Sequence, residues 1–192
     1  GKSKLNKRQK KLIRYAIIAL IAIIVIVNQK PKTDLPEISK VEDLSSLIDK
    51  IYEGQDNLLP SLATQTVDVT DADYVKMVTG FENGDNFEYI AVSEPMMTSQ
   101  AYSFVLAKVK TDVNADQIAK EMSEKVDMVK WICVSAEKLY ATSSGDVVCL
   151  VMGSEQMVKP VYEKFKEVAG SVNEEYERQT EELNIEDIEE MQ

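Results

Sequence analysis

The chain has 192 residues, of which 44% are hydrophobic, and this share excludes a wholly disordered protein. The 33 acidic residues all lie in residues 34–192, where only 13 bases accompany them, so this body repels phosphates and we expect no nucleic-acid partner. The sequence contains no histidine, which removes the commonest general base and most catalytic zinc sites.

The N-terminal segment joins a basic stretch to an apolar one. Residues 1–14 hold seven Lys or Arg and no acid, and the 13 residues from Tyr15 to Val27 are unbroken by charge. A run of this length suits either a cleaved signal peptide or a membrane anchor. The segment "VIVNQKPKTD" offers no small-residue cleavage site, which favours the anchor. Basic residues before an apolar run are typical of the cytoplasmic side.

We therefore predict a transmembrane signal anchor over residues 12–28, preceded by a basic cytoplasmic segment, residues 1–14. Leu12 and Ile13 lengthen the span if Arg14 extends its guanidinium to the lipid headgroups. The protein would be a single-pass protein of the cell membrane, with its N-terminus cytoplasmic and its folded domain extracytoplasmic. Cleaved secretion is the alternative. The residues predicted to form the anchor are Arg14, Tyr15, Ile17, Ile18, Leu20, Ile21, Ile23, Ile24, Val25, Ile26 and Val27.

Residues 29–38, with two prolines, are predicted to be a linker, and a domain is predicted over residues 39–170. A helix is predicted at its start, because Ser39 and Glu42 have capping-box spacing. The apolar residues of this helix recur at intervals of three and four, which places them on one face. They are Leu44, Leu47, Ile48 and Ile51.

The stretch from Thr70 to Glu82 has some of the acids of a calcium-binding loop. Asp71, Asp73 and Glu82 stand at positions 1, 3 and 12, but Val75 and Lys76 occupy positions that need an oxygen ligand and a glycine. We therefore interpret Thr70, Asp71 and Asp73 as the capped start of a short helix that runs through Val78 and stops at Gly80.

The rest of the domain alternates strands and helices. Strands are predicted over residues 87–93 and 101–110, the second apolar on both faces, and a hairpin with an "SSGD" turn over residues 138–153. A helix opened by Asn114 has the predicted apolar face Ile118, Met122, Val126 and Val129. The last helix begins near Pro160, ends at Gly170, and has the predicted apolar face Val158, Val161, Tyr162, Phe165 and Val168.

This order predicts an α+β fold: an N-terminal transmembrane helix, then an antiparallel sheet built from two strand-strand-helix units with the helices on one face. Residues 171–192 hold nine acids and no heptad pattern. We predict that they form an acidic tail, solvated and partly helical or disordered.

The segments "FVLAKVKTD", "NADQIAKEMSEKV" and "GDVVCLVMGSE" resemble an uncharacterised bacterial family, domain of unknown function 4358, over about residues 44–170. The resemblance implies a small domain tethered outside the membrane of a Gram-positive bacterium. It implies no activity and no functional residues.

Five residues stand out in the predicted domain. Cys133 and Cys149 could form one disulfide outside the cell, or they could be two free buried thiols. Met96 and Met97 are adjacent in a connector, where both cannot easily point inward, so they indicate a possible partner surface. Trp131 follows a helix and is predicted to pack in the core.

We expect a non-enzymatic binding domain that serves as an accessory or scaffold subunit for an envelope protein. It would contact membrane lipid through its N-terminal helix and need no cofactor or metal. The alternative is an extracytoplasmic domain that senses a ligand or a cation. A hydrolase using paired carboxylates among Glu82, Asp85, Glu88 and Glu94 is a third interpretation, which nothing else in the sequence favours.

Overall fold

The computed structural model describes residues 6–27, 32–56, 58–97 and 99–180, and it divides the chain into two units, residues 1–31 and 32–192. The first unit contains helix α1, Lys7–Val27. Among the described residues, no helix has both the length and the apolar character needed to cross a membrane. The predicted transmembrane helix over residues 12–28 is therefore not supported. The apolar run covers only about 20 Å of a hydrocarbon core of about 30 Å, and Lys10, Lys11 and Arg14 occupy the turns before it.

The second unit is an α+β domain around a six-stranded, wholly antiparallel sheet of order β1-β2-β3-β5-β4-β6. This confirms the predicted fold class and the predicted succession strand, strand, helix, strand, strand, helix. The elements are α2 Val41–Tyr52, β1 Leu62–Val67, α3 Ala72–Thr79, β2 Phe87–Pro95, β3 Ser103–Val109, α4 Ala115–Lys125, β4 Lys138–Ser144, β5 Val147–Gly153, α5 Glu155–Ala169 and β6 Tyr176–Gln179.

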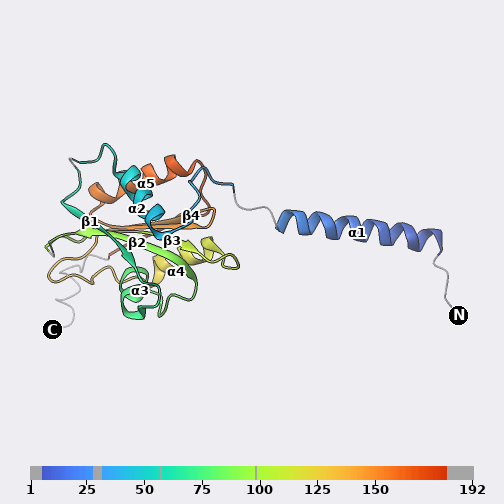
Figure 1. Cartoon of the computed structure of the whole chain (residues 1–192), viewed down its shortest axis with the longest axis horizontal. Helices are drawn as coiled ribbons and strands as arrows, with labels where there is room; N and C mark the ends of the chain where they lie inside the picture. The colour runs from blue at the N-terminus through green and yellow to red at the C-terminus, as the bar shows by residue number, and fades with distance from the viewer. Residues whose placement is uncertain (1–5, 28–31, 57, 98, 181–192) are drawn as a thin grey trace, which may run out of the picture. The chain divides into compact units, whose positions relative to one another are not determined.

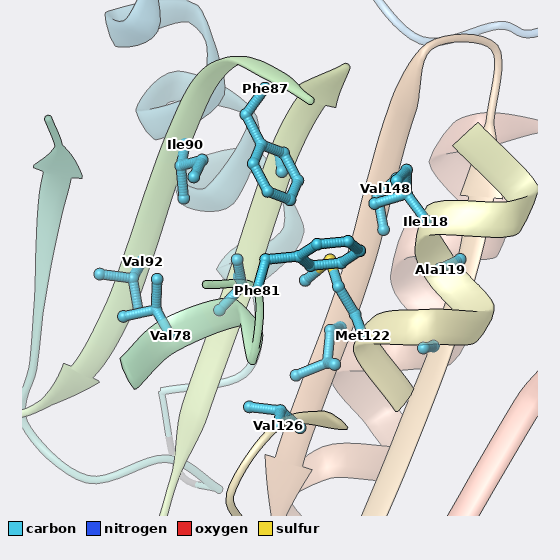
Figure 2. Close-up of a cluster of buried hydrophobic side chains, with 14 of the residues drawn as sticks. Val78, Phe81, Phe87, Ile90, Val92, Ile118, Ala119, Met122, Val126 and Val148 are labelled. Atoms are coloured by element: carbon cyan, nitrogen blue, oxygen red, sulfur yellow. The ribbon is translucent and has the colours of Figure 1, made fainter. Parts of the chain in front are cut away.

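Helices cover both faces of the sheet, so the prediction that they lie on one face is wrong (Figure 1). One core forms between the sheet and helices α3 and α4, and Figure 2 shows its centre, with Met122 of α4 beside Phe81. The other forms between the sheet and helices α2 and α5. The cause is visible in the two central strands: all seven residues of β5 are buried, and β3 has one partly exposed residue. Strands that are apolar on both faces require a layer on each.

The sheet is wider than the sequence pattern predicted, because β1 and β6 were not predicted. β6 lies inside the predicted acidic tail and pairs with β4, which extends the domain to about residue 180. Its alternating side chains, Tyr176 and Arg178, turn inward to half-buried positions, while Glu177 and Gln179 stay exposed. Residues 176–179 are thus an edge strand and not a solvated tail. The rest of that prediction, residues 181–192, lies outside the described residues.

The predicted linker also ends earlier than expected, because residues 32–38 belong to the domain. Leu35 and Ile38 are buried in the core under α2 and α5. The backbone N–H of Asp34 donates to the carbonyl of Ala169, 2.9 Å away, and the Ser144 hydroxyl donates to Thr33 Oγ1 at 2.7 Å. The chain therefore enters the domain along a fixed path beside the β4–β5 turn and the end of α5.

Most predicted helix faces and ends are confirmed. The apolar faces predicted for α2 and for α5 are packed in the core, and the Asp71 and Asn114 side chains cap α3 and α4. Two details of the helix starts are wrong. Asp43, and not the pair Ser39 and Glu42, caps α2 by accepting from the N–H groups of Ser39 and Lys40. Helix α5 begins five residues before Pro160, at Glu155.

Candidate interaction surface

Met96 and Met97 follow directly on β2 and are 72% and 71% exposed. The Met96 N–H donates to the Ser61 carbonyl at 3.1 Å, which continues the pairing of β1 and β2 by one residue. The Ser61 hydroxyl donates to Met96 Sδ at 3.7 Å. The backbone at Met96 is thus held by the sheet while both thioether side chains project into solvent.

An ion pair beside these methionines joins three segments of the domain. The Lys130 ammonium donates to Glu94 Oε1 at 2.5 Å and lies 3.5 Å from the carbonyl oxygen of Met77 on α3. It also lies 5.1 Å from the centre of the Trp131 ring. The Lys130 side chain is only 9% exposed. A charge buried this far and paired on three sides fixes the loop after α4 against β2 and α3.

The three segments that meet at Lys130 each carry exposed apolar side chains. Met77 lies on α3, Val129 and Ile132 lie on either side of Lys130 and Trp131, and Met96 and Met97 follow Glu94. We call Met77, Met96, Met97, Val129 and Ile132 the methionine surface. Methionine side chains adapt to irregular partners, and these five exposed apolar residues lie on segments that Lys130 holds together, which makes them candidates for an interaction site.

Sequence reasoning missed Met77 and Ile132, and it placed Val129 wrongly on the buried face of a helix. Helix α4 ends at Lys125, and the N–H of Val129 donates to the Asp127 carboxylate at 2.9 Å in a turn. Val129 is therefore exposed. The signal that could have found it is Asp127 itself, because aspartate directly after an apolar helix face favours a turn.

Partly buried side chains support the methionine surface from beneath. Trp131 packs against the core under α3 and α4, as predicted. The Tyr74 hydroxyl donates to Gln65 Oε1 on β1 at 3.0 Å, and burial together with the nearby Glu94 carboxylate raises the pKa of Tyr74. These contacts give the surface a rigid support that does not depend on a partner.

The two cysteines are free thiols in this structure. Cys149 lies on β5 in the core under α2 and α5, and its burial raises its pKa well above the usual value. Cys133 is exposed in the loop after Trp131. The interpretation of two buried thiols is thus right for Cys149 and wrong for Cys133, and the alternative disulfide is not formed here.

The acids of the calcium-like stretch serve local structure. Asp71 caps α3, and Glu82 pairs with Lys76 at 2.8 Å. Across residues 6–27, 32–56, 58–97 and 99–180, no group of three or more His, Cys, Asp or Glu is placed to hold a metal ion.

An open groove of about 630 Å³ lies between the end of α2 and α5. Its lining is mainly charged and includes Gln55, whose buried Oε1 has no hydrogen-bond partner while its Nε2 donates to the Ile51 carbonyl. The remaining lining residues are Glu53, Pro160, Glu163, Lys164, Lys166 and Glu167.

Helix α1 carries the residues predicted to contact lipid. Its apolar side chains are exposed around the helix, and Arg14 is exposed beside them. The exposed ones are Leu12, Ile13, Tyr15, Ile17, Ile18, Leu20 and Ile21. Ile23, Ile24, Val25, Ile26 and Val27 lie in the helical backbone, but their side chains fall outside the described part of the chain.

No protein-family model, curated protein or solved structure matches this chain. The resemblance to domain of unknown function 4358 therefore stays a prediction.

Proposed function

We propose that the protein is a membrane-associated, non-enzymatic binding protein, whose α1 contacts lipid and whose domain serves as an accessory or scaffold subunit for an envelope protein. The observation that carries the proposal is the exposure of apolar side chains on all sides of α1, directly after a basic segment. Transfer of exposed Ile and Leu side chains from water into lipid is favourable, and Lys and Arg are attracted to anionic headgroups.

Flotation of the full chain with vesicles of phosphatidylglycerol and phosphatidylcholine tests the lipid contact. We expect the native chain to float with the vesicles and the Ile17→Asn/Ile21→Asn variant to float markedly less. A matched control, Val129→Asn/Ile132→Asn, changes two exposed apolar residues of the domain and should float like the native chain. Equal flotation of the α1 variant and the native chain would contradict the lipid contact.

The methionine surface supports the second part of the proposal. It presents adaptable apolar side chains on a support fixed by the Lys130–Glu94 ion pair, with no need for the surface to fold on binding. Its occupant, in this proposal, is an apolar face of a protein that shares the membrane with α1, since tethering to one surface raises the effective concentration of the two partners.

A photo-crosslinking amino acid at position 97 tests this partner in intact membranes. We expect a reproducible protein adduct from Met97→p-benzoylphenylalanine and none from the same residue at Lys159, an exposed position on α5. Adducts of equal yield from both positions would indicate random collision and would count against the methionine surface.

One observation favours the alternative, a ligand-sensing domain. The orphan Oε1 of Gln55 lies in the lining of a groove where Lys164 pairs with Glu167 and Lys166 pairs with Glu163. Gln55 Oε1 and the Glu53 carboxylate are the acceptors left in this lining for an organic ammonium group. Calorimetric titration of the full chain with spermidine tests this alternative. It would be supported by binding that Gln55→Leu weakens and that Glu124→Gln on α4 leaves unchanged.

A further inference from the structure

The sheet has two edges, and they differ in charge. β6 carries Glu177 and Arg178, and Glu177 forms an ion pair with Lys138 at 2.7 Å. β1, with the sequence LATQTV, has no charged residue along its six positions. Natural proteins protect exposed strand edges with charges, prolines or bulges, because an unprotected edge pairs with other strands. β1 has none of these between Leu62 and Val67.

β1 is held in regular extended form by its own domain. It pairs with β2 over six consecutive residues without a register shift, whereas the pairing of β2 with β3 is interrupted near Phe87. Val67 is buried in the core under α3 and α4, and Gln65 accepts from Tyr74 on the same face. Alternate residues of such a strand direct their N–H and C=O groups away from the sheet. In the described residues, no backbone hydrogen bond joins β1 to any segment other than β2.

We propose that β1 pairs in antiparallel fashion with β1 of a second copy of the chain, which joins the two sheets into one. Residues 34–192 carry 33 acids and 13 bases, so two copies repel each other over most of their surfaces. At the uncharged outer edge of β1, two copies can approach closely without bringing like charges on that strand together.

The sequence of β1 is compatible with itself in this pairing. Opposed residues in an antiparallel pair must lie on the same face of the sheet, and a two-fold axis at Gln65 satisfies this requirement. Thr64 then opposes Thr66, Ala63 opposes Val67, and each Gln65 opposes its counterpart. Threonine pairs across strands are favourable, and none of the five paired positions, residues 63–67, carries a charge.

Charge-swap variants at Thr66, an exposed residue of β1, test the pairing. Sedimentation velocity of the full chain in non-ionic detergent, over a range of protein concentrations, reads out the dimer. We expect the native chain to dimerise, and Thr66→Lys alone and Thr66→Glu alone each to weaken dimerisation by about two- to fivefold, because residue 66 and its counterpart are diagonal neighbours across the axis and carry like charges.

An equimolar mixture of the two variants should restore the dimer, which a misfolded variant could not do. As a matched control, Gln179→Lys puts the same charge on the β6 edge and should leave the dimer unchanged. A native chain that stays monomeric at every concentration overturns the proposal. So does association of equal strength in all variants, which would assign it to α1. Because the readout contains no vesicles and no partner protein, the result does not depend on the proposed function.

Discussion

The hydroxyl groups of Tyr52 on α2 and Tyr102 before β3 lie 3.0 Å apart in the core under α2 and α5. Burial raises the pKa of Tyr52 from 10.0 to about 12, and burial and the nearby Tyr52 also raise the pKa of Tyr102. The folded state therefore favours the neutral phenols over the ionised ones. Their contribution to the free energy of unfolding is fully present below pH 10, where unfolded tyrosine is neutral too, and it is lost as the pH rises from about 10 to about 12.

We predict that the free energy of unfolding falls by up to about 2.7 kcal/mol over that range on account of Tyr52 alone. Urea titrations at pH 9 and pH 11, followed by the fluorescence of Trp131, the one tryptophan of the chain, measure the loss. Tyr52→Phe/Tyr102→Phe should show a smaller loss, with little change at pH 7 since both hydrogen-bond partners are removed together. Tyr15→Phe, in α1, is the control. An equal alkaline loss in the double variant would contradict this assignment.

Among the elements, β6 and α4 are joined by a contact that neither the helix nor the strand pattern reveals. Arg178 donates from Nη1 to the carbonyl of Glu124 at 2.6 Å and from Nη2 to the carbonyl of Val126, and its Nε lies 3.0 Å from Met128 Sδ. The guanidinium thus satisfies carbonyls at the C-terminus of α4, which have no partner within the helix.

Arg178→Ala should lower the free energy of unfolding by about 1–3 kcal/mol, because it leaves those carbonyls unpaired. Trp131 fluorescence in a urea titration measures the change. Lys110→Ala removes an exposed cation from the end of β3 and should change the midpoint little. A midpoint that Arg178→Ala leaves unchanged would show that water replaces the guanidinium at no cost.

The helices and strands also show which structural features the spacing of apolar residues was enough to predict. In α2 and α5 the spacing of apolar residues predicted the buried faces, because a helix with one apolar stripe can bury it in one way only. In β3 the pattern showed apolar residues on both faces, and the second layer of helices follows from that. β6 could not be predicted, because Tyr176 and Arg178 become an inward row only when α4 and β4 lie beside them.

For the whole molecule, the sequence predicts a cell-surface domain with a cytoplasmic N-terminus. This location needs the chain to cross the membrane, and no helix among the described residues has the length and apolar character to do so, so thiol labelling is a direct test of it. Cys133 is exposed, while Cys149 is buried and poorly ionised, so one thiol of the folded domain is open to reagents.

We predict that a membrane-impermeant maleimide added to intact cells labels the native chain and Cys149→Ser but not Cys133→Ser. Gel-shift analysis after labelling provides the measurement, and lysed cells provide the control for thiol reactivity. Labelling only after lysis would place the domain on the cytoplasmic side and would contradict the predicted location.

The sequence by itself determined the α+β class, the antiparallel pairing of the central strands, the apolar faces of α2 and α5 and the exposed methionine pair. These properties depend on residue spacing along one segment, and local geometry fixes what that spacing means. The tertiary structure alone decided the strand order, the two-sided helix layers, the edge strands β1 and β6, and the meeting of Met77, Glu94 and Lys130 at one surface. Each of these joins residues far apart in the chain, and no local pattern records which distant segment supplies the neighbour.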